Sequence, residues 1–242
     1  MPGRLTMIFG LRPRELKDHF PIDRRPQNER NEQNLWGRKS IDLLGGGRTV
    51  KIFITGGTGF VGKTLASALI WSGKEVTILT RSAKGGPTGI AWVEGDPTQR
   101  GGWQERVKGH DVVINLAGAS IFSRWTEKTK KTLRESRILT TRHIVEAMEG
   151  GKGKALFSTS AIGYYGFHGD EDLTEESPPG GDFLALLARD WEAEAREAEK
   201  RGCRVVIARF GIVLGEKGGA LGQMIPLFEK LPVGTLVWIC ER

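Results

Sequence analysis

A glycine-rich turn between an apolar run and a helical stretch is the feature that most constrains the fold of this chain. Residues 50–54 read as a buried strand. Residues 55–62 carry four glycines, of which Gly56, Gly59 and Gly62 are spaced G-x-x-G-x-x-G. Gly56 permits a sharp turn, Gly59 a close approach of the backbone to an anion, and Gly62 close packing of the helix on the strand. The pattern predicts a strand–turn–helix junction that cradles a diphosphate.

The next strand ends on a cation. After the helix breaks, the apolar run 75–80 completes a β-α-β unit, and Arg81 follows it. At this position a carboxylate bonds the ribose 2′-hydroxyl of NAD, whereas a cation accommodates the 2′-phosphate of NADP. A guanidinium suits phosphate because it donates two parallel charge-assisted hydrogen bonds. Arg81, helped by the hydroxyls of Thr80 and Ser82, is therefore predicted to select NADP(H). Lys84 can share this role, and a solvated arginine is the alternative.

The positive charge of the chain is concentrated near its N-terminus. Of a net charge of +7 over 242 residues, residues 1–48 carry ten Lys or Arg against six Asp or Glu. This segment buries too little apolar surface to offset its ordering entropy, so we expect a basic, mostly disordered extension. A transit peptide fits poorly because such peptides are Ser-rich and acid-poor. The alternative is that the true start lies near residue 49.

Composition also limits the partners that we expect. A hydrophobic content of 38% suffices for a globular core. No apolar segment approaches the roughly 20 residues of a membrane helix, so we expect no membrane partner and a cytoplasmic location. Cys203 and Cys240 lie far apart without metal-ligand spacing, which predicts no metal site. The basic extension lacks interleaved aromatic residues, so nucleic acid is not expected, although salt-sensitive DNA binding through residues 1–48 is an alternative.

Short apolar runs alternate with helical patterns along the rest of the chain. This alternation predicts an α/β fold with a doubly wound parallel sheet. Ligands of such sheets bind outside the carboxyl ends of the strands. A core-facing stripe is expected on the last helix. Strands are expected at 89–93, 111–118, 155–158 and 204–209, helices at 126–148 and 183–200, and the stripe at Leu184, Leu187, Trp191, Ala195 and Ala198.

Several motifs in order resemble those of the atypical extended short-chain dehydrogenase/reductases, whose members are labelled epimerase family protein. The resemblance implies a Rossmann NADP(H)-binding domain over residues 49–228, a small-molecule substrate and a possible homodimer. It also implies a smaller C-terminal substrate part, which is largely missing here because residues 229–242 depart from the family pattern as a truncated tail would. The motifs are 55–62, 115–118, 124–126, 135–137, 160–166, 177–179, 191–192 and 209–215.

The resemblance also implies a set of cofactor contacts. Chemistry alone does not single out Leu116, Ala117 or Val213, since strand ends are commonly apolar, and Arg137 equally fits a solvated helix charge. The implied contacts are Gly56, Thr58, Gly59, Phe60, Val61 and Gly62 to the pyrophosphate, Thr80 and Arg81 to the adenosine phosphate, Leu116 and Ala117 to the inner ribose side, Arg137 from the long helix, and Ile212 and Val213 to the nicotinamide side.

The catalytic residues depart from the pattern of the wider superfamily, whose members place a Tyr and a Lys four residues apart on the helix after the fifth strand. There a lysine favours the phenolate form of the tyrosine. This chain has two tyrosines, Tyr164 and Tyr165, no Tyr-x-x-x-Lys, and an apolar helix where a proton relay would need polar groups. We expect Ser160 to hydrogen-bond a substrate oxygen, and either tyrosine to donate a proton if the fold supplies a cation. The alternative is that Ser160 satisfies turn backbone and the tyrosines line a pocket.

Taken together, the residues and the resemblance predict an NADP(H)-dependent oxidoreductase or epimerase-type enzyme acting on a small carbonyl or sugar-like substrate. The chemistry of hydride transfer would belong to the cofactor. The absence of the usual Tyr and Lys pair favours a second hypothesis, a non-catalytic NADP-binding protein that senses redox state or acts as a scaffold.

Overall fold

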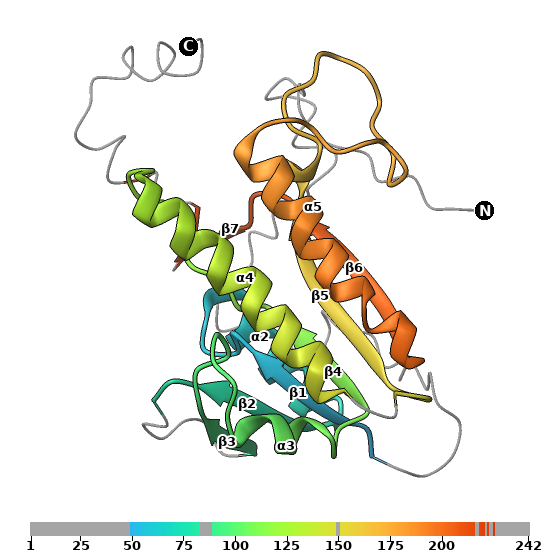
Figure 1. The fold of residues 1–242 in the computed structure, drawn as a ribbon. Helices are drawn as coiled ribbons and strands as arrows, with labels where there is room; N and C mark the ends of the chain where they lie inside the picture. The colour runs from blue at the N-terminus through green and yellow to red at the C-terminus, as the bar shows by residue number, and fades with distance from the viewer. Residues whose placement is uncertain are drawn as a thin grey trace, which may run out of the picture. The chain divides into compact units, whose positions relative to one another are not determined.

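A six-stranded parallel sheet organises the part of the chain that the structure describes (Figure 1). The computed structural model describes residues 49–82, 89–148, 151–215, 218–220, 222 and 225. The strand order is β3-β2-β1-β4-β5-β6, and every neighbouring pair is parallel. The predicted doubly wound α/β sheet is therefore confirmed. Its strands are β1 (Lys51–Thr55), β2 (Glu75–Thr80), β3 (Ile90–Glu94), β4 (Val112–Asn115), β5 (Ala155–Ala161) and β6 (Arg204–Phe210).

Helices cover both faces of this sheet. In Figure 1, α4 and α5 run side by side along one face. The main helices are α2 (Phe60–Trp71), α3 (Trp103–Val107), α4 (Glu127–Ala147) and α5 (Phe183–Arg196), and the shorter elements are the 3-10 turns η2 (Ile162–Tyr164) and η3 (Glu199–Arg201) and the hairpin of β7 (Leu214–Gly215) and β8 (Gly218–Gly219).

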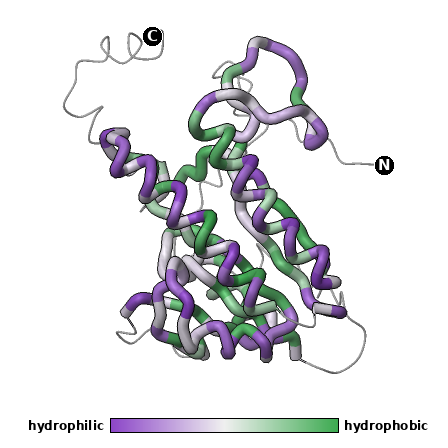
Figure 2. Tube along the Cα trace, viewed as in Figure 1, coloured by the Kyte–Doolittle hydropathy of each residue, from purple (hydrophilic) through white to green (hydrophobic). Residues whose placement is uncertain are grey.

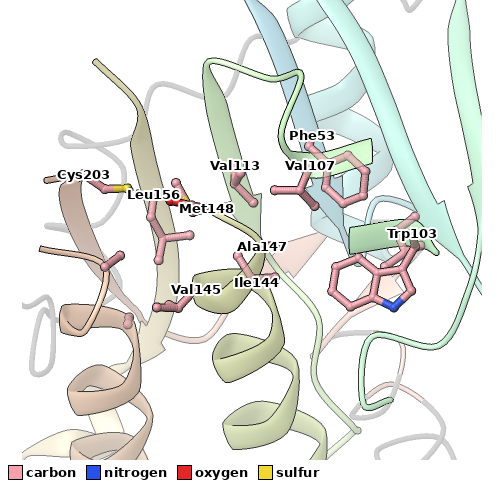
Figure 3. Packing of buried hydrophobic residues seen from close by; sticks show 13 residues of the cluster. Phe53, Trp103, Val107, Val113, Ile144, Val145, Ala147, Met148, Leu156 and Cys203 are labelled. Atoms are coloured by element: carbon pink, nitrogen blue, oxygen red, sulfur yellow. Dashed lines mark hydrogen bonds between the residues drawn. The ribbon is translucent and has the colours of Figure 1, made fainter. Parts of the chain in front are cut away.

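The alternation of side chains along β1 builds two separate core layers. Ile52 and Ile54 pack on one face with Ala66 of α2. Phe53 points to the other face, where it joins residues of α3, α4 and α5. Figure 3 shows this second layer, with the Trp103 ring beside Phe53 at a centroid distance of 6.4 Å. A central strand buried on both faces explains why residues 50–54 read as an almost continuous apolar run.

Side-chain caps fix where α4 and α5 begin. The Thr126 hydroxyl accepts a hydrogen bond from the Thr129 N–H, and Asp182 Oδ1 accepts from the N–H groups of Leu184 and Ala185. The N-terminal part of α4 is mainly purple in Figure 2, as expected for a helix that turns Lys, Arg and Glu side chains to solvent. Its inward side chains include the fully buried Leu133.

Several element ends differ from the sequence-based expectation. β4 ends at Asn115 and is therefore shorter than the expected strand over 111–118. β5 continues to Ala161 because residues 155–161 all pair with β6, so its polar Ser-Thr-Ser run belongs to the strand. α5 ends at Arg196 and is followed by η3 and by Gly202, which adopts a left-handed φ of 81°. Neither α3 nor the β7–β8 hairpin was expected.

The chain divides into two units. One comprises Arg48–Glu171 with Pro178–Arg242, and contains the sheet. Of the other, Met1–Gly47 with Asp172–Ser177, the structure describes residues 172–177, where the Thr174 N–H donates to Ser177 Oγ. The expectations for residues 1–48 and 229–242 fall outside the described residues.

His110 is a half-buried titratable side chain in the loop before β4. Its Nδ1 lies 2.7 Å from the carbonyl oxygen of Arg106, and its Nε2 lies 2.8 Å from Thr77 Oγ1. The ring also meets the Phe53 ring edge-on at 5.2 Å. Burial lowers the pKa of His110 from its ordinary value, although the hydrogen bond to the Arg106 carbonyl opposes this. The fold therefore favours the neutral imidazole.

We expect His110 to make the stability of the chain depend on pH. Because its folded-state pKa is lowered, the unfolded chain takes up a proton that the folded chain resists. Its contribution is fully present above the unfolded value of about 6.5 and is lost as the pH falls through that value toward the folded one. Urea unfolding between about pH 7.5 and about pH 5.5 should show a smaller loss of stability for His110→Gln than for the wild type. Equal losses would contradict this assignment.

Candidate functional site

The turn between β1 and α2 is held by close backbone approaches. Gly56 has a φ of 71°, and a Cβ at this position would lie 2.6 Å from the carbonyl carbon of Leu116. A Cβ on Gly62 would lie 2.7 Å from the Cα of Gly57. The Gly59 N–H donates to the Gly56 carbonyl at 3.0 Å. Only glycine fits at positions 56 and 62, as the spacing predicted.

The N-terminus of α2 carries no side-chain cap. Its N-cap is Gly59, no side chain accepts from its first turn, and no acidic residue lies in that turn. Backbone N–H groups of residues 60–62 have no partner within the helix, as in any first turn. Side chains cap α4 and α5, but no side chain caps α2 within the part of the chain that the structure describes. The first amides of α2 and the positive end of its dipole can therefore bind an anion. Thr58 is exposed beside them.

The side chain of Phe60 joins this turn to the segment after β6. A Cβ on Gly215 or Gly218 would run into the Phe60 ring, so the ring rests directly on the β7–β8 backbone. Val213 lies at the start of this hairpin, and its carbonyl accepts from the Ala220 N–H at 3.0 Å. The segment that was expected to border the nicotinamide, which includes Val213, therefore lies against the glycine turn at residues 55–62.

The ends of β2 and β3 form the expected adenosine side. The Gly95 N–H donates to the Thr80 carbonyl at 2.9 Å, which ties the two strand ends together. The Thr80 hydroxyl is engaged locally with the backbone of Ser82. Burial raises the pKa of Asp96, but hydrogen bonds from Thr98 and the charge of Arg81 outweigh it and lower the pKa overall. Arg81 is itself exposed, and Lys84 lies outside the described residues.

A buried polar network lies beneath the end of β4. Thr55 Oγ1 donates to Asn115 Oδ1 at 2.7 Å, and Asn115 Nδ2 donates to Thr141 Oγ1 at 2.9 Å. The indole N–H of Trp191 also donates to Thr141 Oγ1, at 2.8 Å. This network connects β1, β4, α4 and α5 directly below Leu116. Sequence reasoning did not assign a role to Thr55 or Thr141.

Arg137 lies beside the loop after β4. Its guanidinium donates to the carbonyl oxygens of Leu133 and Ala119 at 3.2 and 3.1 Å, and its Cζ lies 5.3 Å from the centroid of the Trp191 ring. A Cβ on Gly118 would lie 3.1 Å from Arg137 Cζ. Burial lowers the pKa of Arg137 from its ordinary value. This arginine is therefore packed against the site, and the alternative of a solvated helix charge does not describe it.

Ser160 lies in a buried ion-pair network between β5, β6 and α5. Its hydroxyl donates to Glu192 Oε1 at 2.6 Å. Arg209 is the register partner of Ser160 on β6, and its Nε and Nη2 donate to the two Glu192 oxygens at 2.8 Å each. The side chains of Arg209 and Glu192 are only 12% and 5% exposed. The hydrogen bond to Glu192 raises the pKa of Arg209, so the guanidinium stays charged.

Both tyrosines contact Arg209. Arg209 Nη1 donates to the Tyr165 hydroxyl at 2.8 Å, and its Cζ lies 3.6 Å from the centroid of the Tyr164 ring. The two rings meet edge-on at 5.4 Å. A tyrosine can donate a proton here only if the fold supplies a nearby cation. Arg209 is that cation, and it contacts both tyrosines.

Glu192 is a polar side chain of α5 that reaches the site, and it lies beyond the apolar stretch where this helix begins. This residue lies on the buried side of α5, among Ala188, Trp191 and Ala195, and is 4% exposed. A carboxylate on an apolar helical stripe is the signal that could have identified it, because a charged residue is rarely buried without a partner. Glu192 and Arg209 each lie in one of the family-like motifs, at 191–192 and 209–215, but sequence reasoning did not pair them.

Metal-binding clusters and membrane-spanning helices are absent from the ranges of the chain that the structure describes. No group of three or more His, Cys, Asp or Glu side chains is arranged to hold a metal ion within these ranges. None of the helices described is long and apolar enough to cross a membrane.

The parallel sheet, its strand order and its glycine turn define a Rossmann-type α/β domain. Residues 52–231 match the model of the NAD dependent epimerase/dehydratase family, and the chain belongs to this family. It is similar to the epimerase family protein YfhF of Bacillus subtilis, with 42% identity over 195 residues that cover 77% of this chain and 62% of the relative. The chain spans 55% to 62% of the length of the curated relatives it matches, among them an Arabidopsis thaliana protein.

Two solved structures share the fold and much of the sequence. The human epimerase family protein SDR39U1, determined with NADPH, has a TM-score of 0.60 and 32% identity, covering 75% of this chain and 60% of that one. A nucleoside-diphosphate sugar epimerase from Corynebacterium glutamicum has a TM-score of 0.64 and 35% identity, covering 78% of this chain and 39% of that one.

We expect the loss of Glu192 to be far more costly than the loss of a comparable carboxylate on the same helix. Glu192→Ala would leave the Arg209 cation buried beside an unpaired Ser160 hydroxyl, at a cost of about 3–5 kcal/mol in the free energy of unfolding. Glu194→Ala removes the partner of Arg142, a carboxylate whose side chain is 21% exposed, and should cost about 1 kcal/mol or less. Urea unfolding measures both variants, and similar losses would contradict the buried network.

Proposed function

We propose that this chain is an NADP(H)-binding protein of oxidoreductase or epimerase type that acts on a small carbonyl or sugar-like substrate. The observation that carries the proposal is the uncapped glycine turn at the start of α2, at the carboxyl edge of the sheet. The human relative was solved with NADPH, and the Corynebacterium relative is a nucleoside-diphosphate sugar epimerase. These likenesses support the same cofactor and a sugar-nucleotide substrate for this chain.

The residues of the turn fit a dinucleotide. Any side chain at Gly56 or Gly62 would collide with backbone, and a Cβ on Gly59 would lie 3.2 Å from the Gly56 carbonyl oxygen. The turn therefore stays free of side chains where the first amides of α2 would meet a diphosphate. When bound, the nicotinamide supplies hydride chemistry. Phe60 and the hairpin that begins after Val213 lie against each other, and both would border the bound cofactor.

Arg81 is the feature that favours NADP(H) over NAD(H). Its side chain is exposed at the end of β2, where the 2′-phosphate would lie, and no carboxylate replaces it there. Asp96 follows β3, and the charge of Arg81 contributes to lowering the pKa of its carboxyl group. We infer that Asp96 orients the guanidinium, and that the two planar N–H pairs face the phosphate.

A non-catalytic role is the second candidate. It is favoured by the absence of a Tyr-x-x-x-Lys in the chain and by the engagement of the Ser160 hydroxyl with Glu192. NADPH oxidation with a panel of small carbonyls and nucleoside-diphosphate sugars separates the two candidates. Turnover of any member supports an enzyme. NADPH binding without turnover of any of them supports a sensor or scaffold.

We expect NADPH to bind more tightly than NADH, and Arg81→Ala to remove most of the difference. A charge-assisted contact to the 2′-phosphate is worth about 1.5–3 kcal/mol, or roughly ten- to a hundredfold in affinity. Titration of nicotinamide fluorescence measures both cofactors. Arg106→Ala is the matched control, since Arg106 is an exposed arginine on α3, and it should leave the preference intact. If the wild type bound NADPH and NADH with equal affinity, Arg81 would not be the residue that selects NADP(H).

We expect Gly62→Ala to weaken NADPH binding by roughly ten- to a hundredfold. The added methyl group would meet the Gly57 backbone, and the forced shift of the turn costs about 1–3 kcal/mol. Gly102→Ala is the control, because a Cβ there has no atom within 4 Å and the φ of Gly102 is −59°. The same fluorescence titration applies. Unchanged affinity in Gly62→Ala would place the cofactor elsewhere.

A further inference from the structure

We propose that the two adjacent tyrosines have different roles, with Tyr164 as the proton donor of the site and Tyr165 as a positioning residue that holds Arg209. The inference rests on the proposed function, since it places a proton beside the expected nicotinamide side. The three hydroxyl groups near the ends of β5 and β6, those of Ser160, Tyr164 and Tyr165, differ in their hydrogen bonds.

The proton of Ser160 is already committed. Its only hydroxyl proton points to Glu192 Oε1 at 2.6 Å, and a carboxylate paired with Arg209 offers lone pairs and no proton in return. The serine oxygen can therefore accept a hydrogen bond from a substrate hydroxyl. It cannot donate one to a substrate carbonyl without breaking the bond to a buried charge.

Tyr165 is placed as an anchor. The residue is 7% exposed, and its hydroxyl oxygen accepts from Arg209 Nη1 at 2.8 Å. This bond adds a third point of attachment to a guanidinium that Glu192 already holds at two. Tyr165 therefore helps to fix the plane of the Arg209 guanidinium. Because Tyr165 is buried, a substrate has little access to its hydroxyl.

Tyr164 has the opposite surroundings. It is only partly buried, and its hydroxyl makes no hydrogen bond to any residue that the structure describes. The face of its ring lies on the Arg209 guanidinium, 3.6 Å from Cζ to the centroid. A fixed cation against the ring stabilises the negative charge that grows on a phenol as its proton leaves. Arg209 thus takes the place that a lysine occupies in the wider superfamily.

The reaction that follows conserves atoms and charge. During carbonyl reduction, the substrate oxygen takes the proton of Tyr164 Oη while the carbonyl carbon takes a hydride from the reduced nicotinamide. The C=O bond becomes C–OH, and the cofactor is oxidised. The phenolate left on Tyr164 regains a proton from water, which its partial exposure permits.

Fluorine NMR of protein labelled with 3-fluorotyrosine tests the assignment without a known substrate. The chain has two tyrosines, so two resonances are expected, and Tyr164→Phe and Tyr165→Phe assign them. We expect the Tyr164 resonance to shift both on exchange of H₂O for D₂O and on saturation with NADP⁺, and the Tyr165 resonance to move much less. The reverse pattern, or no response of Tyr164 to bound NADP⁺, overturns the proposal.

The cofactor titration run alongside separates this inference from the proposed function. If neither NADP⁺ nor NADPH binds, the proposed function fails and the inference with it. If the cofactor binds but Tyr165 is the tyrosine that responds, the inference alone fails. Unfolding in urea adds an independent readout, because Tyr165→Phe should lower the midpoint, whereas Tyr164→Phe should leave it nearly unchanged.

Kinetics with any substrate from the carbonyl and sugar-nucleotide panel give the second arm. General acid catalysis predicts that Tyr164→Phe lowers kcat by about a hundred- to ten-thousandfold with little change in KM. Tyr165→Phe, which acts through Arg209, should lower kcat by less than about tenfold. A larger loss in Tyr165→Phe than in Tyr164→Phe would exchange the two roles and overturn the proposal.

Discussion

The ion pair between Glu192 and Arg209 is the interaction on which the candidate site depends. Removing two charges from water costs nearly as much as their attraction returns, so the net contribution of such a pair to stability is small. Its importance is geometric. Glu192 comes from α5, Arg209 from β6, and Ser160 from β5, and one carboxylate holds all three elements at the carboxyl edge of the sheet. The positions of the tyrosines follow from this arrangement.

The same principle applies one strand further along, under β4. The side chains of Thr55, Asn115, Thr141 and Trp191 are joined by hydrogen bonds, so each of these buried polar side chains has a partner. Such networks are costly when a member is missing and rigid when all are present. The two networks together place rigid polar support beneath the strand ends where a dinucleotide would bind. The layer around Phe53, shown in Figure 3, is apolar by contrast.

The features that could be predicted from the sequence are mostly those that depend on the spacing of residues close together in the chain. The turn at residues 55–62 and the alternation of strands and helices follow from patterns within a few residues, and the predicted doubly wound sheet is confirmed. Glu192 could not be placed in this way, because its partners stand 17 and 32 residues away along the chain. Likewise, the sequence treats Tyr164 and Tyr165 alike. Only packing against β6 separates an anchored hydroxyl from an open one.

Replacing a lysine by Arg209 changes more than the position of a charge. An ammonium group can lose a proton and pass it on, whereas a guanidinium stays protonated in proteins and can only donate hydrogen bonds. Arg209 is also held by three hydrogen bonds of 2.8 Å, two to Glu192 and one to Tyr165. A site built on it cannot relay protons through the cation. Any proton that Tyr164 gives up must therefore return through solvent, which makes the exposure of that tyrosine a requirement of the chemistry.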